Sequence, residues 1–313
     1  MLETLGELKG LALKVGQMLS YMDGALPEAI KPTFQRALTK LQSQAPAMTW
    51  EAIEPVLLEE LGSLDQHFAS IEHEPFAAAS IGQVHRATLH DGQSVVVKIQ
   101  YPGVADSVKS DLKLVKPIAM RMMGVKEQDI KQYIEEVESK LLEETDYDLE
   151  LKQSMEVAEI CAPLENVFFP NYYPELSGDR ILTMDWLDGM HLKEFLETNP
   201  SQEIKDKAAQ TLWDFYDYQL NEMKAIHADP HPGNFLFRED GSVGVIDFGC
   251  IKRVPEEFYA KYFRLMDERL LQGQDEELKQ LFHDLQFLTD KDSDEEEQMF
   301  FEVFKNLMTL LTL

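Results

Sequence analysis

The chain has few cysteines, few basic side chains and no long apolar run. Only two of its 313 residues are cysteines, Cys161 and Cys250, and no Cys-x-x-Cys pair occurs. A disulfide framework and a cysteine-based zinc module are therefore excluded, and a reducing compartment fits. No stretch of about 18 unbroken apolar residues is present, so we expect no membrane-spanning helix. The first residues also lack the pattern of a signal peptide.

Basic residues are scarce and unevenly distributed. The chain holds 57 acidic and 29 basic side chains, a net charge of −28, which argues against nucleic acid as a partner because phosphates would be repelled. The first fifty residues are the exception, with five basic and four acidic side chains. We expect a cytoplasmic protein in which this segment makes peripheral contact with the inner (cytoplasmic) membrane.

Hydrophobic periodicity predicts an α+β protein. Three-to-four spacing of apolar residues predicts helices in the ranges 1–22, 28–43, 50–61, 104–123, 128–160 and 191–225, and from Glu256 onward. Alternating patterns predict strands around an Asp91-Gly92 turn, within 167–189, and around an Asp240-Gly241 turn.

Four short segments have the order and spacing of protein-kinase motifs. Ala77, Ala79, Gly82 and Val84 stand where a G-x-G-x-x-G-x-V phosphate loop has its glycines and valine. VVVK at 95–98 lies on a predicted strand, HAD at 227–229 is followed at +5 by an asparagine, and DFG occupies 247–249. Each match alone is weak, but four in the right order on the right predicted elements are strong.

The residue types suit phosphoryl transfer, which requires positioning and charge neutralisation. Lys98 would bind the α and β phosphates, Asn234 and Asp247 would hold Mg²⁺ with oxygen ligands, and Asp229 would orient the attacking group or accept its proton. For the carboxylate that fixes Lys98, spacing leaves three candidates open: Glu144, Asp146 and Glu150.

Other residues near these motifs have more than one interpretation. Met184 would gate an adenine pocket and Asp185 to Leu187 would offer backbone groups to the base, although Met184 and Trp186 also fit a plain core. His227 is more simply a buried structural histidine, although the H-x-D-x-H pattern that it forms with Asp229 and His231 resembles metal-ligand spacing.

Four features resemble the UbiB family of atypical kinases, also called AarF-type. They are KVGQ at 14–17, AAASIGQVH at 77–85, ETD at 144–146 and DPHPGN at 229–234. The resemblance implies an α+β, protein-kinase-like two-lobed fold with an N-terminal helical extension that covers the active site. It divides the chain into the extension (1–74), an N-lobe (75–186) and a mainly helical C-lobe (187–313).

The resemblance also implies ligands and residue roles. It implies ATP or ADP with Mg²⁺ and a part in ubiquinone or other isoprenoid-lipid biosynthesis. A quinone or isoprenoid lipid, a membrane surface and other quinone-biosynthesis proteins are candidate partners. Lys14 and Gln17 would face the nucleotide, with Glu144 and Asp146 near the same place, and Glu150 is favoured as the partner of Lys98. The implied nucleotide-binding set is Ala77, Ala78, Ala79, Ser80, Gly82, Val84, Lys98, Met184, Asp185 and Leu187.

Three departures from ordinary kinases narrow the predicted reaction. Alanine at 77 and 79 prevents the closest approach of backbone to phosphate, so the loop must take another shape. Ala228 replaces the arginine that holds a phosphorylated loop, and few residues separate Asp247 from the VPEEF segment. We therefore favour ATP hydrolysis or phosphorylation of a small lipid-related molecule over protein phosphorylation. A catalytically silent nucleotide-binding scaffold, and a metal hydrolase built on His227, Asp229, His231 and Asp247, are the alternatives.

Overall fold

The computed structural model describes residues 47–78, 81–106, 113, 138–139, 142–229, 231–265, 267, 275–289 and 292–311. The described residues of 1–215 and 227–251 form one compact unit, and those of 216–226 and 252–313 form another. The predicted helices over 1–22 and 28–43 lie outside the described residues, as does most of the range 104–146.

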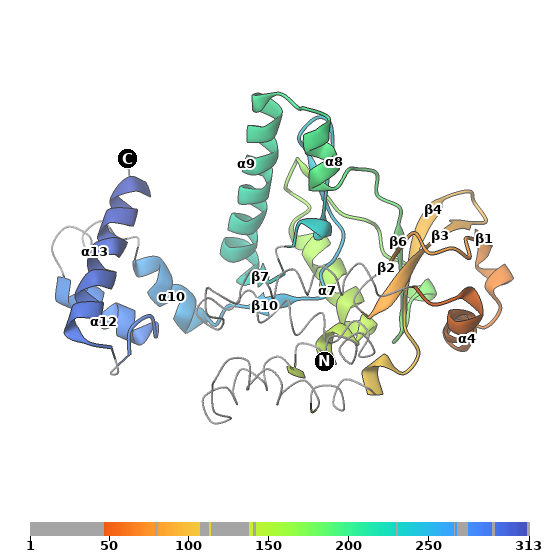
Figure 1. Cartoon of the computed structure of the whole chain (residues 1–313), viewed down its shortest axis with the longest axis horizontal. Helices are drawn as coiled ribbons and strands as arrows, with labels where there is room; N and C mark the ends of the chain where they lie inside the picture. Colours follow the sequence, from red (N-terminus) through yellow and green to blue (C-terminus); the bar gives the residue numbers. More distant parts are fainter. Residues whose placement is uncertain are drawn as a thin grey trace, which may run out of the picture. The chain divides into compact units, whose positions relative to one another are not determined.

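The first unit contains a five-stranded antiparallel sheet (Figure 1). Its order is β1-β3-β4-β6, with β2 also paired to β3. The strands are β1 (Phe68–Ile71), β2 (Ala77–Ala78), β3 (Gly82–Leu89), β4 (Ser94–Gln100) and β6 (Ile181–Asp185). The predicted turn joins β3 to β4: Gly92 has a φ of 91°, and the Asp91 carboxylate accepts a hydrogen bond from the Gln93 N–H.

Alternation along β3 and β4 gives the sheet two different faces. One face, which we call the α4 face, carries Gln83, His85 and Ala87 of β3 and is buried, whereas Val84 and Arg86 on the opposite face are only half-buried. Lys98 pairs with Val84 and belongs to that half-buried side, which we call the Lys98 face.

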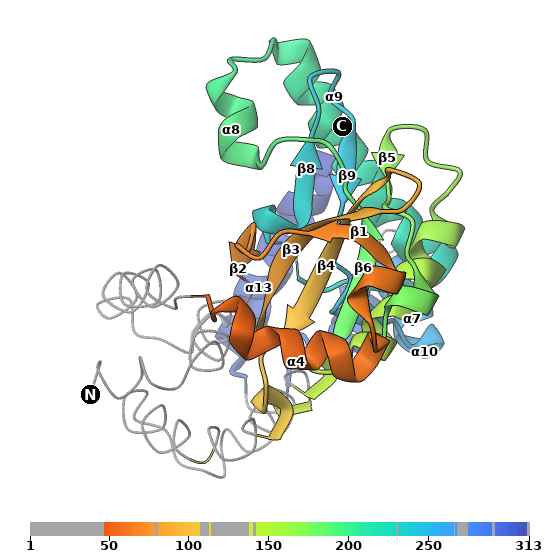
Figure 2. The same ribbon diagram turned by 90° about the vertical axis from the view of Figure 1, so that its right-hand side faces the viewer.

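Helix α4 (Trp50–Leu61), the predicted helix over 50–61, covers the α4 face, as Figure 2 shows. Its Ile53 and Leu57 have no exposed surface and join a cluster with Val95, Val97 and Ile99 of β4. These are the large apolar side chains whose burial contributes most to stability.

The remainder of the first unit follows the predicted order of helix and hairpin. It comprises α7 (Tyr147–Ile160), β5 (Val167–Phe168), α8 (Leu192–Glu197), α9 (Gln202–Tyr218), β8 (Phe235–Phe237) and β9 (Val243–Val245). Strand β9 lies between β5 and β8 in a three-stranded sheet. The predicted Asp240-Gly241 turn is confirmed, with Gly241 at a φ of 80° and the Asp240 carboxylate accepting from the Ser242 N–H.

The second unit is mainly helical, as predicted from Glu256 onward. It contains a π-helix (Gln219–Met223), α10 (Glu256–Arg264), α12 (Asp275–Asp284) and α13 (Asp294–Leu311), and the short strands β7 (Ala225–His227) and β10 (Ile251–Arg253) pair where the chain passes between the units. Leu278 and Phe282 of α12 are fully buried in its core with Phe301 of α13.

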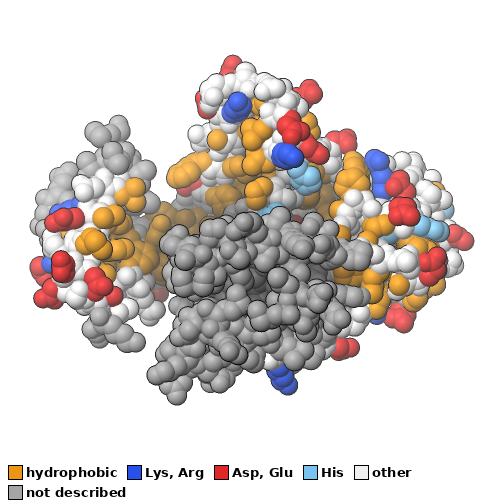
Figure 3. All heavy atoms as spheres, viewed as in Figure 1, with side chains coloured by type: hydrophobic (Ala, Val, Ile, Leu, Met, Phe, Trp, Pro, Cys, Tyr) orange, Lys and Arg blue, Asp and Glu red, His pale blue; other side chains and the backbone are white. Residues whose placement is uncertain are grey.

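The helices and the surface charge can be compared with the composition of the chain. No helix in the described part of the chain combines the length and apolar character needed to cross a bilayer. Acidic side chains are scattered over the coloured surface in Figure 3, with few basic side chains among them, as the net charge of −28 requires.

Candidate active site

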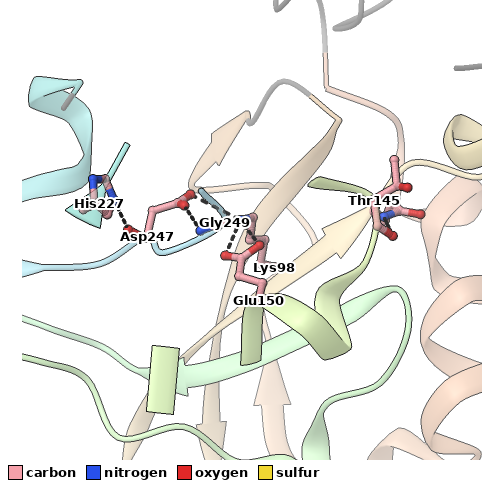
Figure 4. A network of polar contacts seen from close by, with 7 residues as sticks. Lys98, Thr145, Glu150, His227, Asp247 and Gly249 are labelled. Atoms are coloured by element: carbon pink, nitrogen blue, oxygen red, sulfur yellow. Dashed lines mark hydrogen bonds and ion pairs between the residues drawn. The ribbon is translucent and has the colours of Figure 1, made fainter. Parts of the chain in front are cut away.

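Lys98 lies at the centre of the candidate site, on the half-buried face of β4. Its side chain is 12% exposed, and its ammonium nitrogen lies 2.7 and 2.9 Å from the two carboxylate oxygens of Glu150. The Glu150 side chain is only 4% exposed. Of the three carboxylates that spacing left open, Glu150 is therefore the one that contacts Lys98, as the family resemblance favoured (Figure 4).

The start of α7 explains why Glu150 and not Asp146 meets Lys98. The Asp146 carboxylate is the N-cap of α7 and accepts a hydrogen bond from the Leu149 N–H at 2.8 Å. Glu150 lies one helical turn further on, where its side chain is directed at the sheet. Two bonds fix the approach of the helix: Gln100 Nε2 donates to the Thr145 carbonyl, and the Tyr147 N–H donates to the Asp179 carbonyl.

Asp247 lies two residues after the end of β9, and its side chain contacts the same Lys98 ammonium. Its Oδ2 lies 3.3 Å from Lys98 Nζ, and its side chain remains 38% exposed. Oδ1 accepts the Gly249 N–H at 2.9 Å, while the backbone carbonyl lies 2.7 Å from His227 Nε2. The predicted convergence of Lys98 and Asp247, which are 149 residues apart, is present in the structure.

Burial and charge act against each other in this cluster. Burial alone would lower the pKa of Lys98, but Asp247 and Glu150 outweigh it and raise that pKa well above its ordinary value. Burial raises the pKa of the Glu150 carboxyl to about 7, against the opposing effect of Lys98. Lys98 therefore keeps its positive charge at physiological pH. Its ammonium is the group of the Lys98–Glu150 pair that can bind an anion.

The loop after β7 places Asn234 and Asp229 together. Asn234 Nδ2 donates to the Asp229 carbonyl at 3.0 Å, which turns the amide oxygen of Asn234 in the other direction. His227 is 2% exposed, in keeping with a structural histidine, and exposed His231 uses its Nδ1 to accept the Gly233 N–H. The described residues hold no group of three or more His, Cys, Asp or Glu side chains that could bind a metal.

The alanine-rich loop begins as a regular strand. Ala77 and Ala78 form β2 and pair with Val84 and Gln83, so these alanines have extended backbone and need no glycine. Gly82 is required for a different reason from the one expected, since a Cβ there would collide with the Ile99 carbonyl of β4. Ala79 and Ser80 lie outside the described residues, as do Lys14 and Gln17.

The end of β6 holds the three residues predicted to contact a base. Met184 is 7% exposed and pairs with Val96 on the Lys98 face. The Asp185 N–H donates to the Asn171 carbonyl, and its carboxylate accepts from Gln93 and Tyr173. Leu187 extends to Gly244 of β9, which leaves room for its side chain because it has no Cβ.

Comparisons with known proteins agree with this geometry. Residues 40–282 match the ABC1 atypical kinase-like domain. The chain belongs to the ABC1 atypical kinase-like family.

Relatives of this family cover most of the chain. It is 34% identical over 292 residues to atypical kinase COQ8B, mitochondrial, of Rattus norvegicus, covering 92% of this chain and 54% of that protein. It is 31% identical over 263 residues to atypical kinase COQ8, mitochondrial, of Saccharomyces cerevisiae, covering 83% of this chain and 52% of that protein. The chain thus spans about half the length of these curated relatives.

A solved structure confirms the fold. The Rv3197–erythromycin complex from Mycobacterium tuberculosis superposes with a TM-score of 0.65 at 31% identity, covering 93% of this chain and 73% of that one. The α+β, protein-kinase-like fold expected from the sequence is therefore confirmed. Residues 1–46 of the predicted N-terminal extension, which include the KVGQ segment, lie outside the described residues, and the rest of that extension contributes α4 and β1 to the first unit.

Several residues that lie close to these motifs were not singled out from the sequence. The fully buried Tyr147 ring has its centroid 5.0 Å from Lys98 Nζ, close enough for a cation–π interaction. Phe76 is 61% exposed, makes an edge contact with Trp186, and Arg86 lies over the same indole ring at 4.1 Å. Their positions in the sequence could have drawn attention to two of them, because Tyr147 directly follows the ETD segment and Phe76 directly precedes the alanine-rich loop.

Proposed function

We propose that this chain is an atypical kinase or ATPase that binds ATP or ADP with Mg²⁺ and supports the biosynthesis of ubiquinone or another isoprenoid lipid. The observation that carries the proposal is Lys98, a charged ammonium held by Glu150 at 2.7 Å with the half-exposed Asp247 at 3.3 Å. A cation fixed between two carboxylates, on the less buried face of a sheet, is suited to bind a polyphosphate whose charge needs a metal beside it.

Asp247 and Asn234 fit the metal. The Asp247 carboxylate is partly exposed, and the hydrogen bond from Asn234 Nδ2 to the Asp229 carbonyl leaves an amide oxygen directed away from that bond. Two oxygen ligands suit Mg²⁺, which usually binds one or two protein side chains and takes the rest from phosphate and water. Magnesium bound there would neutralise the charge that develops on the transferred phosphoryl group.

The base would bind beside β6. The Asp185 and Trp186 N–H groups already donate to Asn171 and Ser94, so the base would be recognised by the Asp185 carbonyl and by Leu187. The half-buried side chains of Val84 and Val96 would lie against the flat face of the ring. Phe76 and Trp186 would close the outer end.

The phosphoryl acceptor is small. Ala228 cannot hold a phosphorylated loop, and α10 begins at Glu256, soon after Asp247, which leaves no long segment on which a peptide could dock. Asp229 would orient water or a substrate hydroxyl and accept its proton. The quinone-lipid assignment draws support from the UbiB resemblance and from relatives named COQ8 and COQ8B. Peripheral contact at the cytoplasmic membrane belongs to the same proposal.

The test is ATP turnover with Mg²⁺, with and without quinone-like lipid, by wild type, Asp247→Asn and the control Asp214→Asn. Asp214 is exposed on α9, and its carboxylate accepts a bond from Gln210 that an asparagine oxygen could also accept. We expect Asp247→Asn to lose at least about 100-fold in turnover, as when one transition-state contact is removed, and Asp214→Asn to lose none. Equal turnover by all three would refute the site. Nucleotide-dependent thermal stabilisation without turnover would favour the scaffold alternative.

A further inference from the structure

Two residues of β3 on the α4 face and two residues before it in the chain form a hydrogen-bond network that the proposed function does not use. We call Met48, Glu72, Gln83 and His85 the back network. Gln83 has no exposed surface; its Oε1 accepts the Met48 N–H at 2.8 Å and its Nε2 donates to the Met48 carbonyl at 3.2 Å. A residue of a paired antiparallel strand would exchange the same two bonds with Met48.

The rest of the network fixes the protonation state of His85, which is also fully buried. Its Nδ1 lies 2.7 Å from the Glu72 carbonyl and its Nε2 lies 2.9 Å from Gln83 Nε2. Because a carbonyl can only accept, the ring proton belongs on Nδ1, and Nε2 accepts the second proton of the Gln83 amide. The amide oxygen and both N–H groups of Gln83 and both ring nitrogens of His85 are then satisfied.

A second proton on His85 would break this arrangement. Nε2 would become a donor facing the donor amide of Gln83. Rotating the amide by 180° would present its oxygen to His85, but would place NH₂ against the Met48 N–H and oxygen against the Met48 carbonyl. Either choice leaves buried groups unsatisfied, which is costly. The network therefore links the charge of His85 to the two hydrogen bonds between Gln83 and the Met48 backbone.

The surroundings of His85 favour its neutral form. The Trp50 ring lies edge-on to it at 5.5 Å and stacks on His73 at 4.3 Å. Burial is the largest influence and His73 acts in the same direction, while the Glu72 carbonyl and the Glu72 and Glu74 carboxylates oppose them; the pKa of His85 is lowered. The neutral form therefore prevails at pH 7, and protonation requires acid.

We propose that Gln83 is a positioning residue of the nucleotide site, and that it positions the alanine-rich loop only while His85 is neutral. The backbone of Gln83 pairs with Ala78, and the next residue, Val84, pairs with both Ala77 and Lys98. A strand held from behind at Gln83 thus holds the loop and Lys98 in register on the other face. The proposal rests on the proposed function in that its final readout is nucleotide affinity.

The experiment compares Gln83→Leu, Thr183→Val and wild type at pH 7.5. Thr183, on β6, is equally buried and also donates to a backbone carbonyl, that of Leu176, so it matches the loss of a buried hydrogen bond in the same sheet. Amide hydrogen exchange is measured at Met48, bonded to Gln83, and at Phe76, whose N–H donates to Val84 on the loop side. Affinity for Mg²⁺ and an ATP analogue is measured by calorimetry.

We expect Gln83→Leu to accelerate exchange at both amides and to weaken nucleotide binding by about tenfold, the equivalent of a hydrogen bond or two. Thr183→Val should change neither readout by more than about twofold, since it touches neither partner. Faster exchange at Met48 alone, with Phe76 and affinity unchanged, would reduce Gln83 to a local anchor and overturn the proposal. If the wild type binds no nucleotide, the proposed function fails, and Phe76 exchange still decides whether the loop is held.

A pH series keeps the proposal testable if Gln83→Leu does not fold. His85→Gln retains an acceptor for the Gln83 amide but cannot take a charge. Between about pH 7.5 and 4.5, a range that extends below the ordinary histidine pKa because the pKa of His85 is lowered, the protection of the Met48 and Phe76 amides relative to their intrinsic exchange rates should fall in wild type and should not fall in His85→Gln. Parallel pH profiles for the two proteins would overturn the role assigned to His85.

Discussion

The two faces of β3 and β4 both carry polar groups, but these groups differ in charge and in exposure to solvent. On the α4 face, Gln83 and His85 are fully buried and the network around them satisfies their hydrogen bonds. On the Lys98 face, the Lys98 ammonium lies between the carboxylates of Glu150 and Asp247, and Asp247 stays 38% exposed. A satisfied polar network fixes one structure, whereas a partly exposed cluster of charged groups is a candidate ligand-binding site.

Lys98→Met should give the largest effect, because it removes the ammonium that contacts both Glu150 and Asp247. Breaking a buried ion pair from one side costs about 3–5 kcal/mol, and Glu150 will relieve part of this by taking up a proton, since burial already raises its pKa to about 7. ATP turnover should be lost, and urea unfolding should show the destabilisation. Lys152→Met, exposed on the same helix as Glu150, is the control. Turnover within tenfold of wild type in Lys98→Met would contradict the site.

Gly82→Ala tests the edge between the two faces and should rank second. The new Cβ would meet the Ile99 carbonyl, so β3 or β4 must move, and overpacking of this kind costs about 1–3 kcal/mol. Ala78→Gly is the matched change in the opposite direction. In the extended backbone of β2 it should cost only about 0.5–1 kcal/mol. Urea denaturation of both variants measures the difference, and an equal or reversed ranking would mean that Gly82 is not tightly packed.

The sequence predicted the Lys98 face better than the α4 face. Strand alternation and the Asp91-Gly92 turn depend on neighbouring residues, and the kinase-like order of motifs brings Lys98 to Asp247 across 149 residues. The back network has no such signal, because Gln83 meets a backbone group 35 residues earlier and any side chain could stand at Met48.

The choice among three carboxylates shows the same limit. Spacing left Glu144, Asp146 and Glu150 open, and the N-cap of α7 at Asp146 decides which residue points to the sheet. Helix capping depends on where the preceding chain ends, and here that is fixed by contacts from Gln100 and Asp179. Such long-range contacts are not encoded in local periodicity.

Tryptophan fluorescence can report on the two faces separately. Trp186 lies at the outer end of the Lys98 face with Phe76 and Arg86, whereas Trp50 is 8% exposed behind the sheet. We expect an ATP analogue with Mg²⁺ to change the emission of Trp186 and to leave Trp50 unaltered. Trp186→Phe should abolish the change, and Trp213→Phe, which removes a 69% exposed ring on α9, should preserve it. A signal that survives Trp186→Phe would place the base elsewhere.

Arg180→Gln should give the smallest effect and completes the comparison with a second ion pair of the same unit. Arg180 Nε lies 2.7 Å from Glu60 Oε1 and Nη2 lies 2.9 Å from Glu59 Oε2, so it ties α4 to the start of β6. Its side chain is 35% exposed and those of Glu59 and Glu60 are 65% and 15% exposed, against 12% and 4% for Lys98 and Glu150. An ion pair whose cation is this accessible to solvent contributes about 0–1 kcal/mol, and the loss in urea unfolding should shrink further at about 1 M salt, where screening is nearly complete. A loss that is larger, or that salt does not reduce, would show that solvent does not screen Arg180. The contrast between the Arg180 ion pairs and the buried Lys98–Glu150 pair would then fail.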